Sequence, residues 1–261
     1  MSEMKFIKRY SRMQNFLNSK FIVLLKSKRL LISNFKAFIL SFLSKNISYS
    51  QVGEDKVILE IIQNNGYQAA DLFYVDLGAN MPYQYSNTAM FYNMGSRGIT
   101  IDASYVCCLF HKIFRPKDFN LNRFVDSTNF EYKEIYSNDF FGHDPKANFQ
   151  NGKAINKKQK ILKLKNISTN EIFELIKKKS SGKINLLSID LEGIDDKIML
   201  SFNRKILIFD IICFEGDLLN MSCGYLYQNK EDVFKMLGGL NYIKVSHNLM
   251  SHIWIKKDLS W

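Results

Sequence analysis

The chain has 261 residues, of which 46% are hydrophobic and 23% charged, with only three prolines and thirteen glycines. This suits one large α/β domain with a short appendage, and it excludes a disordered chain or two domains joined by a Pro/Gly-rich linker. The four cysteines include the adjacent Cys107 and Cys108, and no CxxC spacing occurs. We therefore expect buried, reduced thiols in a cytoplasmic protein, and neither a disulfide framework nor a zinc site.

The positive charge is concentrated at the N-terminus. The net charge is +11, and residues 1–47 hold ten Lys or Arg side chains and one acid, so residues 48–261 are nearly neutral. A nearly neutral main domain disfavours a nucleic-acid partner, which needs positive charge along its binding cleft. We therefore divide the chain into a basic extension, 1–47, and a main domain, 48–261.

The basic extension is predicted to form one or two helices. Leu31, Phe35, Phe38 and Phe42 follow one another at helical spacing. Lys and Arg interrupt its apolar runs, which fall short of the roughly 20 residues of a membrane-spanning helix. Two interpretations stay open: the helices pack on the main domain or on a second copy of the chain, or they attach the protein to the inner face of an anionic membrane.

From residue 48 onward, the hydrophobic pattern alternates between helices and strands. The first half is expected to contain helix 53–64, strand 72–77, helix 86–94 with Ser86 as N-cap, strand 98–102, helix 105–114, strand 122–126 and strand 129–136. The second half is expected to contain loop 144–160, helix 168–178 with a capping box, strand 184–189, helix 194–202, strand 206–214, helix 231–237 and strands 242–245 and 253–256. This order predicts a doubly wound, mostly parallel seven-stranded sheet that ends in an antiparallel edge hairpin.

Polar residues, most of them acidic, follow the predicted strands at the sheet edge where such folds bind ligands. They are Asp76, Gly78, Asn80, Asp102, Asp126, Asp190, Glu192, Glu215 and His247. A ligand that combines a ribose with a positive charge explains the series, because carboxylates accept hydrogen bonds from ribose hydroxyls and offset a nearby cation. Each position taken alone is equally compatible with a tight turn, a helix cap or a solvated loop.

Taken in order, the motifs of the main domain resemble those of FkbM-type methyltransferases. The matching stretches are Ser50-Gln51-x-Gly53-Glu54-Asp55, 74–80 (YVDLGAN), Ser86-Asn87-Thr88, 95–102, Arg115-Pro116-x-Asp118 and 188–195. The resemblance covers the chain from about residue 49 to its end, except for a poorly matched stretch at 127–180. It implies the class I methyltransferase fold, S-adenosylmethionine as cofactor, and methylation of a hydroxyl on a sugar, a sugar nucleotide, a polysaccharide unit or a natural product.

The resemblance also implies which residues hold the cofactor. Asp76, Gly78 and Asn80 would frame its methionine end, and Asp102 would bind its ribose. The full set of expected cofactor-binding residues is Gln51, Asp76, Gly78, Asn80, Asn87, Asp102 and Asp126. Ala103-Ser104 departs from the asparagine-proline-like continuation usual after Asp102, so the contacts beside the adenosine differ from the family pattern.

A weakly nucleophilic hydroxyl calls for a general base beside the acceptor. Asp190 and Glu192 lie two residues apart, so on an extended segment both point to one side, and we expect them to orient the acceptor, one acting as base. His247 is a further candidate base. We expect no bound metal, although Asp190, Glu192 and Glu215 are of the residue types that hold a divalent cation.

Other functions stay open at this point. The chain could be a non-catalytic scaffold or assembly partner with this fold, or a methyltransferase for a lipid or natural-product hydroxyl, because the loops that select an acceptor diverge freely. An amino-group methyltransferase is disfavoured, because residues 190–193 (DLEG) lack the (D/N)PP(Y/F) turn common in such enzymes.

Overall fold

The computed structural model describes residues 32, 33, 35, 36, 38, 39, 47–127, 131–137, 160–191, 194–215, 229–247 and 251–259. Within these ranges, the side chains of 132–137, 160–163, 246 and 247 lie outside the description. Among the described residues, no helix has the length and apolar character needed to cross a membrane.

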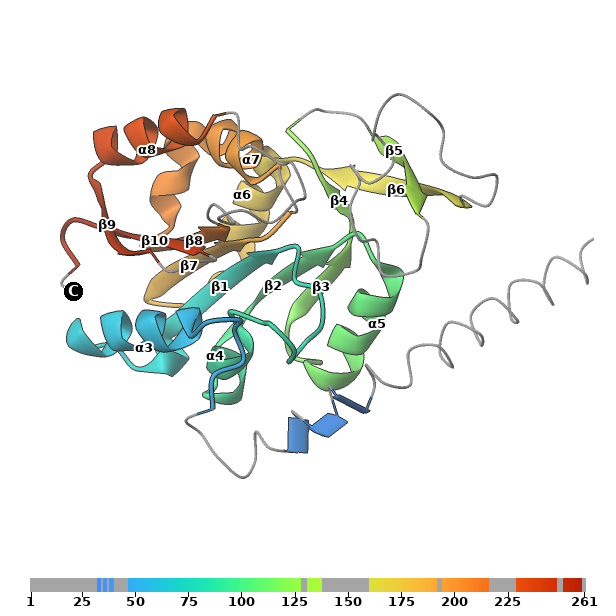
Figure 1. The fold of residues 1–261 in the computed structure, drawn as a ribbon, viewed down its shortest axis with the longest axis horizontal. Coiled ribbons are helices and arrows are strands. Elements are labelled where there is room, and N and C mark those ends of the chain that lie inside the picture. Colours follow the sequence, from blue (N-terminus) through green and yellow to red (C-terminus); the bar gives the residue numbers. More distant parts are fainter. Residues whose placement is uncertain are drawn as a thin grey trace, which may run out of the picture.

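A seven-stranded sheet forms the centre of the molecule (Figure 1). In spatial order its strands are β3 (Phe119–Asn122), β2 (Arg97–Asp102), β1 (Leu72–Leu77), β7 (Ile184–Ile189), β8 (Ile211–Glu215), β10 (Ser251–Lys256) and β9 (Tyr242–His247). The strands from β3 to β8 pair in parallel, whereas β10 is antiparallel to both β8 and β9. This confirms the predicted sheet and its edge hairpin, which together are the arrangement of class I methyltransferases.

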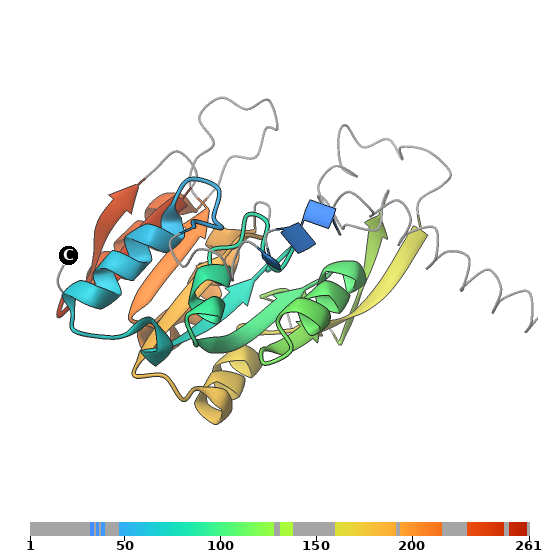
Figure 2. The same ribbon diagram turned by 90° about the horizontal axis from the view of Figure 1, so that it is seen from below.

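Helices cover both faces of this sheet (Figures 1 and 2). One face carries α3 (Glu54–Asn64), α4 (Ala89–Asn93) and α5 (Tyr105–Phe114), and the other carries α6 (Thr169–Lys179), α7 (Asp195–Phe202) and α8 (Lys230–Gly239). Each face has its own apolar core, with Ile58 and Ile62 of α3 in one and Ile172 and Phe202 in the other. Every residue of β1 is buried, as expected for a central parallel strand read from a continuous apolar run.

The strand predicted at 122–126 is wrong. The third parallel strand, β3, is already over at Asn122, and β4 (Phe124–Val125) belongs to a separate three-stranded sheet. That sheet has the order β4-β6-β5, with β5 (Tyr132–Ser137) antiparallel to β6 (Lys160–Ile167). The polar alternation of β3 (FNLN) fits an edge strand that is only partly buried. The strand β6 (KILKLKNI) was not predicted, because its lysines are uncommon in strands.

The strand predicted at 206–214 is wrong in its first half. Residues Asn203–Ile208 form a 3-10 helix, η3, and β8 begins only at Ile211. The Tyr242 hydroxyl lies 3.0 Å from the Ile206 carbonyl oxygen and 2.6 Å from that of Phe209, so these carbonyls face a side chain rather than a neighbouring strand. An apolar run alone does not distinguish these two conformations.

The helices α4 and α6 each begin close to a predicted capping residue. The helix predicted at 86–94 begins at Ala89 with Thr88 at its N-cap, although the Ser86 Oγ still accepts a hydrogen bond from the Ala89 N–H at 3.2 Å. The capping box of α6 is confirmed, because Ser168 and Glu171 bond reciprocally. Propensity thus located both helices, and the side-chain bonds set where each one starts.

Candidate functional site

The loop after β1 is the centre of the candidate site. Gly78 has φ +79°, and its N–H donates to the Ile101 carbonyl at 2.9 Å. The Asp190 N–H donates to the Leu77 carbonyl at 2.9 Å, so the loop is tied to both neighbouring strand ends. A Cβ at position 78 would lie 1.8 Å from the Asp190 carbonyl oxygen. The protein's own backbone therefore requires glycine where β1 and β7 end together.

Asp102 ends β2, and its carboxylate is held from two sides. Its Oδ2 accepts a hydrogen bond from the Asn80 N–H at 2.8 Å and its Oδ1 one from the Ser104 N–H at 2.6 Å. Asn80 makes this contact from the left-handed region, at φ +45°. A carboxylate offers about four acceptor positions, so a fixed and partly exposed one is suited to bind a vicinal diol.

His111 supports the same loop from α5. Its side chain is fully buried, and its Nε2 lies 3.1 Å from the Asn80 carbonyl oxygen. Burial, reinforced by the positive charge of Arg115, lowers the pKa of His111 to about 3. The imidazole is therefore neutral at physiological pH, and because the carbonyl can only accept, Nε2 carries the hydrogen. The sequence offered no signal for this role.

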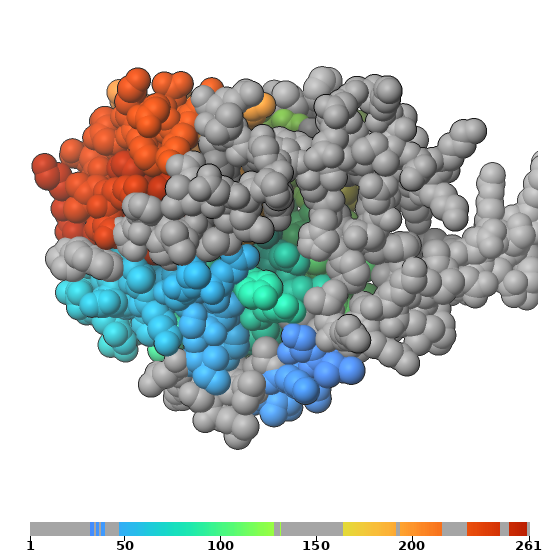
Figure 3. All heavy atoms as spheres, viewed as in Figure 1, coloured from blue at the N-terminus to red at the C-terminus, as the bar shows by residue number. Residues whose placement is uncertain are grey.

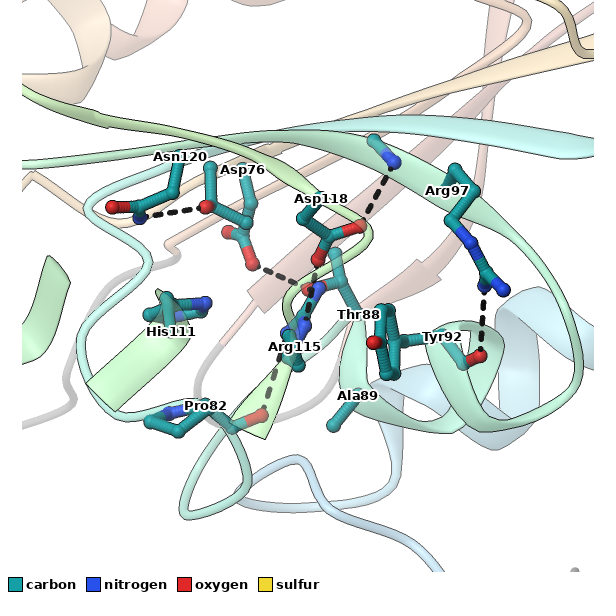
Figure 4. Close-up of polar contacts among 12 residues, drawn as sticks. Asp76, Pro82, Thr88, Ala89, Tyr92, Arg97, His111, Arg115, Asp118 and Asn120 are labelled. Atoms are coloured by element: carbon teal, nitrogen blue, oxygen red, sulfur yellow. Dashed lines mark hydrogen bonds and ion pairs between the residues drawn. The ribbon is translucent and has the colours of Figure 1, made fainter. Parts of the chain in front are cut away.

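Asp76, near the end of β1, belongs to a buried polar network (Figure 4). Only 4% of the residue is exposed, and its Oδ2 accepts a hydrogen bond from the Thr88 hydroxyl at 2.6 Å. Thr88 in turn accepts one from Arg115 Nη2 at 3.0 Å. Burial raises the pKa of Asp76, opposed by the Thr88 hydrogen bond and the charge of Arg115. The network thus holds a carboxylate where solvent is nearly excluded.

A small polar cavity lies on the other side of the loop, at the ends of β7 and β8. Three carboxylate residues, Glu54, Asp190 and Glu215, line it together with Gln51, Tyr85, Asn87, Ile189 and Ser251. Its volume is about 20 Å³, room for one or two water molecules. Glu54 reaches it from the start of α3, where its Oε1 accepts a hydrogen bond from the Ser251 hydroxyl at 3.1 Å. Among the described residues, eight line the cavity and none of them is Lys or Arg.

The structure sorts the predicted site residues into two neighbouring groups. Around the loop after β1 lie Asp76, Gly78, Asn80 and Asp102, and around the cavity lie Gln51, Asn87 and Asp190. Asp190 joins the groups, because its backbone contacts Leu77 and lies against Gly78 while it also lines the cavity. The expected edge is therefore one connected surface.

One predicted residue lies outside these groups, and the side chains of two others are not described. Asp126 does not follow a strand of the main sheet: it follows β4, and its N–H donates to the Ile167 carbonyl at 3.3 Å in the smaller sheet. Glu192 lies outside the described residues. His247 ends β9 and pairs with His252 through the backbone, but its side chain is not described.

Residues that the sequence left without a role complete the site. Glu54, Thr88, Arg115 and Asp118 all lie in the stretches that resemble FkbM-type methyltransferases, yet only the three-dimensional contacts indicate what each side chain holds. Asp55 of the first motif closes the turn before α3, accepting hydrogen bonds that include the Tyr49 N–H at 2.7 Å. In the described ranges, no three His, Cys, Asp or Glu side chains are grouped so as to hold a metal ion.

Comparisons with known proteins give distant similarities. No protein-family model matches the chain. The uncharacterized protein 050L of Invertebrate iridescent virus 6 is 26% identical over 135 residues, which cover 45% of this chain and only 12% of the viral protein.

The similar solved structures include two methyltransferases and a cofactor-bound protein. An O-methyltransferase from Bacillus cereus in complex with SAH has a TM-score of 0.43 and 9% identity, covering 90% of this chain and 97% of its own. Cofactor-bound Rv0187 from MTB has a TM-score of 0.43 and 8% identity, and the match covers 94% of this chain and 96% of Rv0187. The 16S rRNA methylase ArmA has a TM-score of 0.38 and 8% identity, and the match covers 78% of this chain and 82% of ArmA. All three scores are below 0.5, so the fold assignment rests on the strand order of this chain.

Proposed function

We propose that this chain is an S-adenosylmethionine-dependent O-methyltransferase of the FkbM type. The observation that carries the proposal is the Asp102 carboxylate, fixed by two backbone N–H groups at the end of β2, in a sheet with the class I strand order. An acid at this place suits the hydroxyls of a ribose. Asp102 and the loop formed by 77–80 would hold the cofactor, which supplies a methyl group on a sulfonium.

The proposed acceptor is a hydroxyl of a sugar, a sugar nucleotide or a surface polysaccharide unit. The support is the set of carboxylate and amide side chains that line the small cavity beside the loop, because they suit hydrogen bonds with a hydroxyl group placed there. We assign Asp190, with Glu192 and His247, to orienting that hydroxyl and taking its proton. A well-placed base contributes about 10²- to 10⁴-fold to the rate.

The proposal is tested first by cofactor binding and then by methyl transfer. Calorimetric titration with S-adenosylmethionine and with its demethylated product should show saturable binding. Transfer of a labelled methyl group is then measured on sugar nucleotides, glycans, lipids and RNA, with and without EDTA, and label in a sugar that survives EDTA is expected. Absence of binding would refute the cofactor, binding without transfer to any acceptor would indicate a scaffold, and label in RNA would refute the sugar assignment.

For the basic extension we propose peripheral attachment to the inner, anionic face of a membrane. Phe38 packs on the main domain, with ring centroids 5.7 Å from Tyr83 and 5.6 Å from Phe114. Ile32, Phe35 and Ile39 recur at helical spacing and are 52%, 53% and 43% exposed. The described residues of this segment, coloured blue, lie at the surface in Figure 3. Exposed apolar residues in a segment rich in Lys and Arg fit an anionic lipid surface.

Flotation of the full chain with lipid vesicles tests this attachment. The wild type should float with vesicles that contain phosphatidylserine and remain at the bottom with neutral ones. Replacing Ile32, Phe35 and Ile39 together by serine should abolish flotation. Equal behaviour of the variant and the wild type would refute the proposal.

A further inference from the structure

The most deeply buried cation of the described residues lies directly under the candidate site (Figure 4). Arg115 follows the last residue of α5 and is 0% exposed. Its Nε donates to Asp118 Oδ2 at 2.8 Å, its Nη1 to the Pro82 carbonyl at 3.3 Å and its Nη2 to the Thr88 hydroxyl at 3.0 Å. The guanidinium carbon also lies 5.2 Å from the centroid of the Tyr74 ring. Contacts on every side thus fix its orientation.

The partner carboxylate is equally well fixed. Asp118 Oδ1 accepts a hydrogen bond from the Tyr74 hydroxyl at 2.6 Å and one from the Gly98 N–H at 3.1 Å, and the side chains of the ion pair are both 0% exposed. Desolvation offsets most of the attraction in a buried pair, so such a pair adds little net stability over well-packed apolar residues. What it does provide is a guanidinium held in one place.

The hydroxyl of Thr88 converts this fixed position into a directed hydrogen bond. A guanidinium can only donate, so Thr88 Oγ1 must be the acceptor in its bond with Arg115. The single hydroxyl hydrogen of Thr88 is then free to point to Asp76 Oδ2, 2.6 Å away. Arg115, Thr88 and Asp76 therefore form a chain in which each bond determines the direction of the next.

We propose that Arg115 is a positioning residue that acts through Thr88 to hold the Asp76 carboxylate, and with it the loop 77–80, in the arrangement that binds the cofactor. The inference rests on the proposed function, because it assigns Asp76 to the methionine end of S-adenosylmethionine. Arg115 itself contacts Asp118, Pro82, Ser86 and Thr88, so its effect on the ligand is indirect.

The ionisation of Asp76 makes the hydrogen-bond series Arg115–Thr88–Asp76 measurable. Burial raises the pKa of Asp76, while the Thr88 hydrogen bond and Arg115 oppose the rise. The other titratable groups that act on it are Asp118, which is ion-paired to Arg115, and Cys213 on β8, whose pKa burial raises well above its ordinary value. Loss of the Thr88 hydroxyl should raise the pKa of Asp76 further, so Asp76 is the group in this network whose charge should respond to that loss.

The first experiment measures S-adenosylmethionine affinity over a series of pH values across which the protein stays folded. Thr88→Val should bind at least about tenfold more weakly than wild type at the acid end of the series and recover toward wild type as the pH rises. Thr88→Ser keeps a hydroxyl at this position and should stay close to wild type throughout. Thr169→Val removes another buried hydroxyl, one on α6 that donates to the Ser201 carbonyl at 3.2 Å, and it should lower stability and leave the affinity and its pH profile unchanged.

The same loss of affinity at every pH of the series, or no loss, would overturn the inference, because a merely structural role predicts no recovery at high pH. If Thr88→Val fails to fold, Arg115→Lys serves instead. It keeps the charge but loses the planar fork that reaches Asp118 and Thr88 together, so the same weakening and recovery are expected.

A second readout needs no cofactor and separates this inference from the proposed function. The ¹³C resonance of the Asp76 carboxylate, assigned by its loss in Asp76→Asn, should titrate at higher pH in Thr88→Val than in wild type. Identical titrations would overturn the role of Thr88 and Arg115 even in a protein that binds the cofactor. Failure of the wild type to bind S-adenosylmethionine would refute the methyltransferase assignment. It would also remove the cofactor that Arg115 and Thr88 are proposed to help bind.

Discussion

The two halves of the sheet's carboxyl edge are built differently. At β1 and β2 the acids are fixed by specific donors, Asp102 by two backbone N–H groups and Asp76 by a hydroxyl that Arg115 orients. At β7 and β8, Asp190 and Glu215 line one small cavity, and none of its lining residues in the described part of the chain is basic. The first half presents preset acceptors, and the second concentrates negative charge next to them.

This difference suggests a division of labour. Fixed acceptors suit a ligand that is always the same, such as a nucleoside cofactor. A cavity rimmed by carboxylates suits a group that must give up a proton. Substitutions in the two halves should therefore affect different quantities, with cofactor affinity following the β1–β2 half and turnover following the β7–β8 half.

The largest effect is expected at Asp102. In Asp102→Ala the ribose would lose its carboxylate and the Asn80 N–H its acceptor. Hydrogen bonds to charged groups contribute about 1.5–3 kcal/mol each, so two of them correspond to at least about 100-fold in affinity. Calorimetry with S-adenosylmethionine measures the change, and Asp258→Ala, an exposed acid in the turn after β10, is the control for the lost charge. Normal binding by Asp102→Ala would move the ribose contact elsewhere.

Asp190→Asn tests the other half. The substitution keeps the shape and the backbone contacts to Leu77 and Gly78 but removes the basic oxygen, so kcat should fall by about 100-fold or more. The dissociation constant of the cofactor should stay within about threefold of wild type, since that group of contacts is intact. A variant that loses cofactor affinity and keeps its kcat would erase the distinction between the two halves.

The same two halves show what a sequence can and cannot supply. β1 and β7 have the predicted bounds, because strands buried on both faces are continuous apolar runs, and they placed Asp76 and Asp190 correctly. The third strand was predicted in the wrong place, because an edge strand has no such apolar run. Asp126 was therefore wrongly expected at the end of a strand of the main sheet.

The supporting contacts were beyond the reach of sequence patterns. His111 and Arg115 are fully buried polar residues, and only tertiary structure shows that one bonds to the Asn80 carbonyl and the other to Thr88. Long-range side-chain bonds have no period and no spacing in the chain. The sequence therefore predicted that these side chains meet at one edge of the sheet but not the residues that hold that edge in shape.

Gly78 and Gly66 have similar backbone angles but different surroundings, so they can be compared to measure how closely the ends of β1 and β7 meet. Their φ angles are +79° and +75°, but a Cβ at 78 meets the Asp190 carbonyl at 1.8 Å, whereas one at 66 meets nothing within 4 Å. Gly66→Ala should cost about 1–2 kcal/mol of unfolding free energy, the left-handed penalty alone. Gly78→Ala should cost at least about 2 kcal/mol more, because the strand ends must separate. Equal losses in denaturant titrations would show that the two ends do not meet as described.

The smallest effect concerns His111, and it depends on pH. Its pKa is about 3 in the folded protein and about 6.5 in the unfolded chain. The unfolded chain therefore binds more protons between these values, so folding stability falls as pH drops below about 6.5, by about 2 kcal/mol between pH 7 and 5. His111→Gln can still donate to the Asn80 carbonyl but cannot titrate, so its loss of stability over this interval should be smaller than that of wild type by this amount. Denaturant unfolding at pH 7 and pH 5 measures these losses of stability. Identical losses in the variant and the wild type would mean that the imidazole can be protonated while it stays beside the loop 77–80.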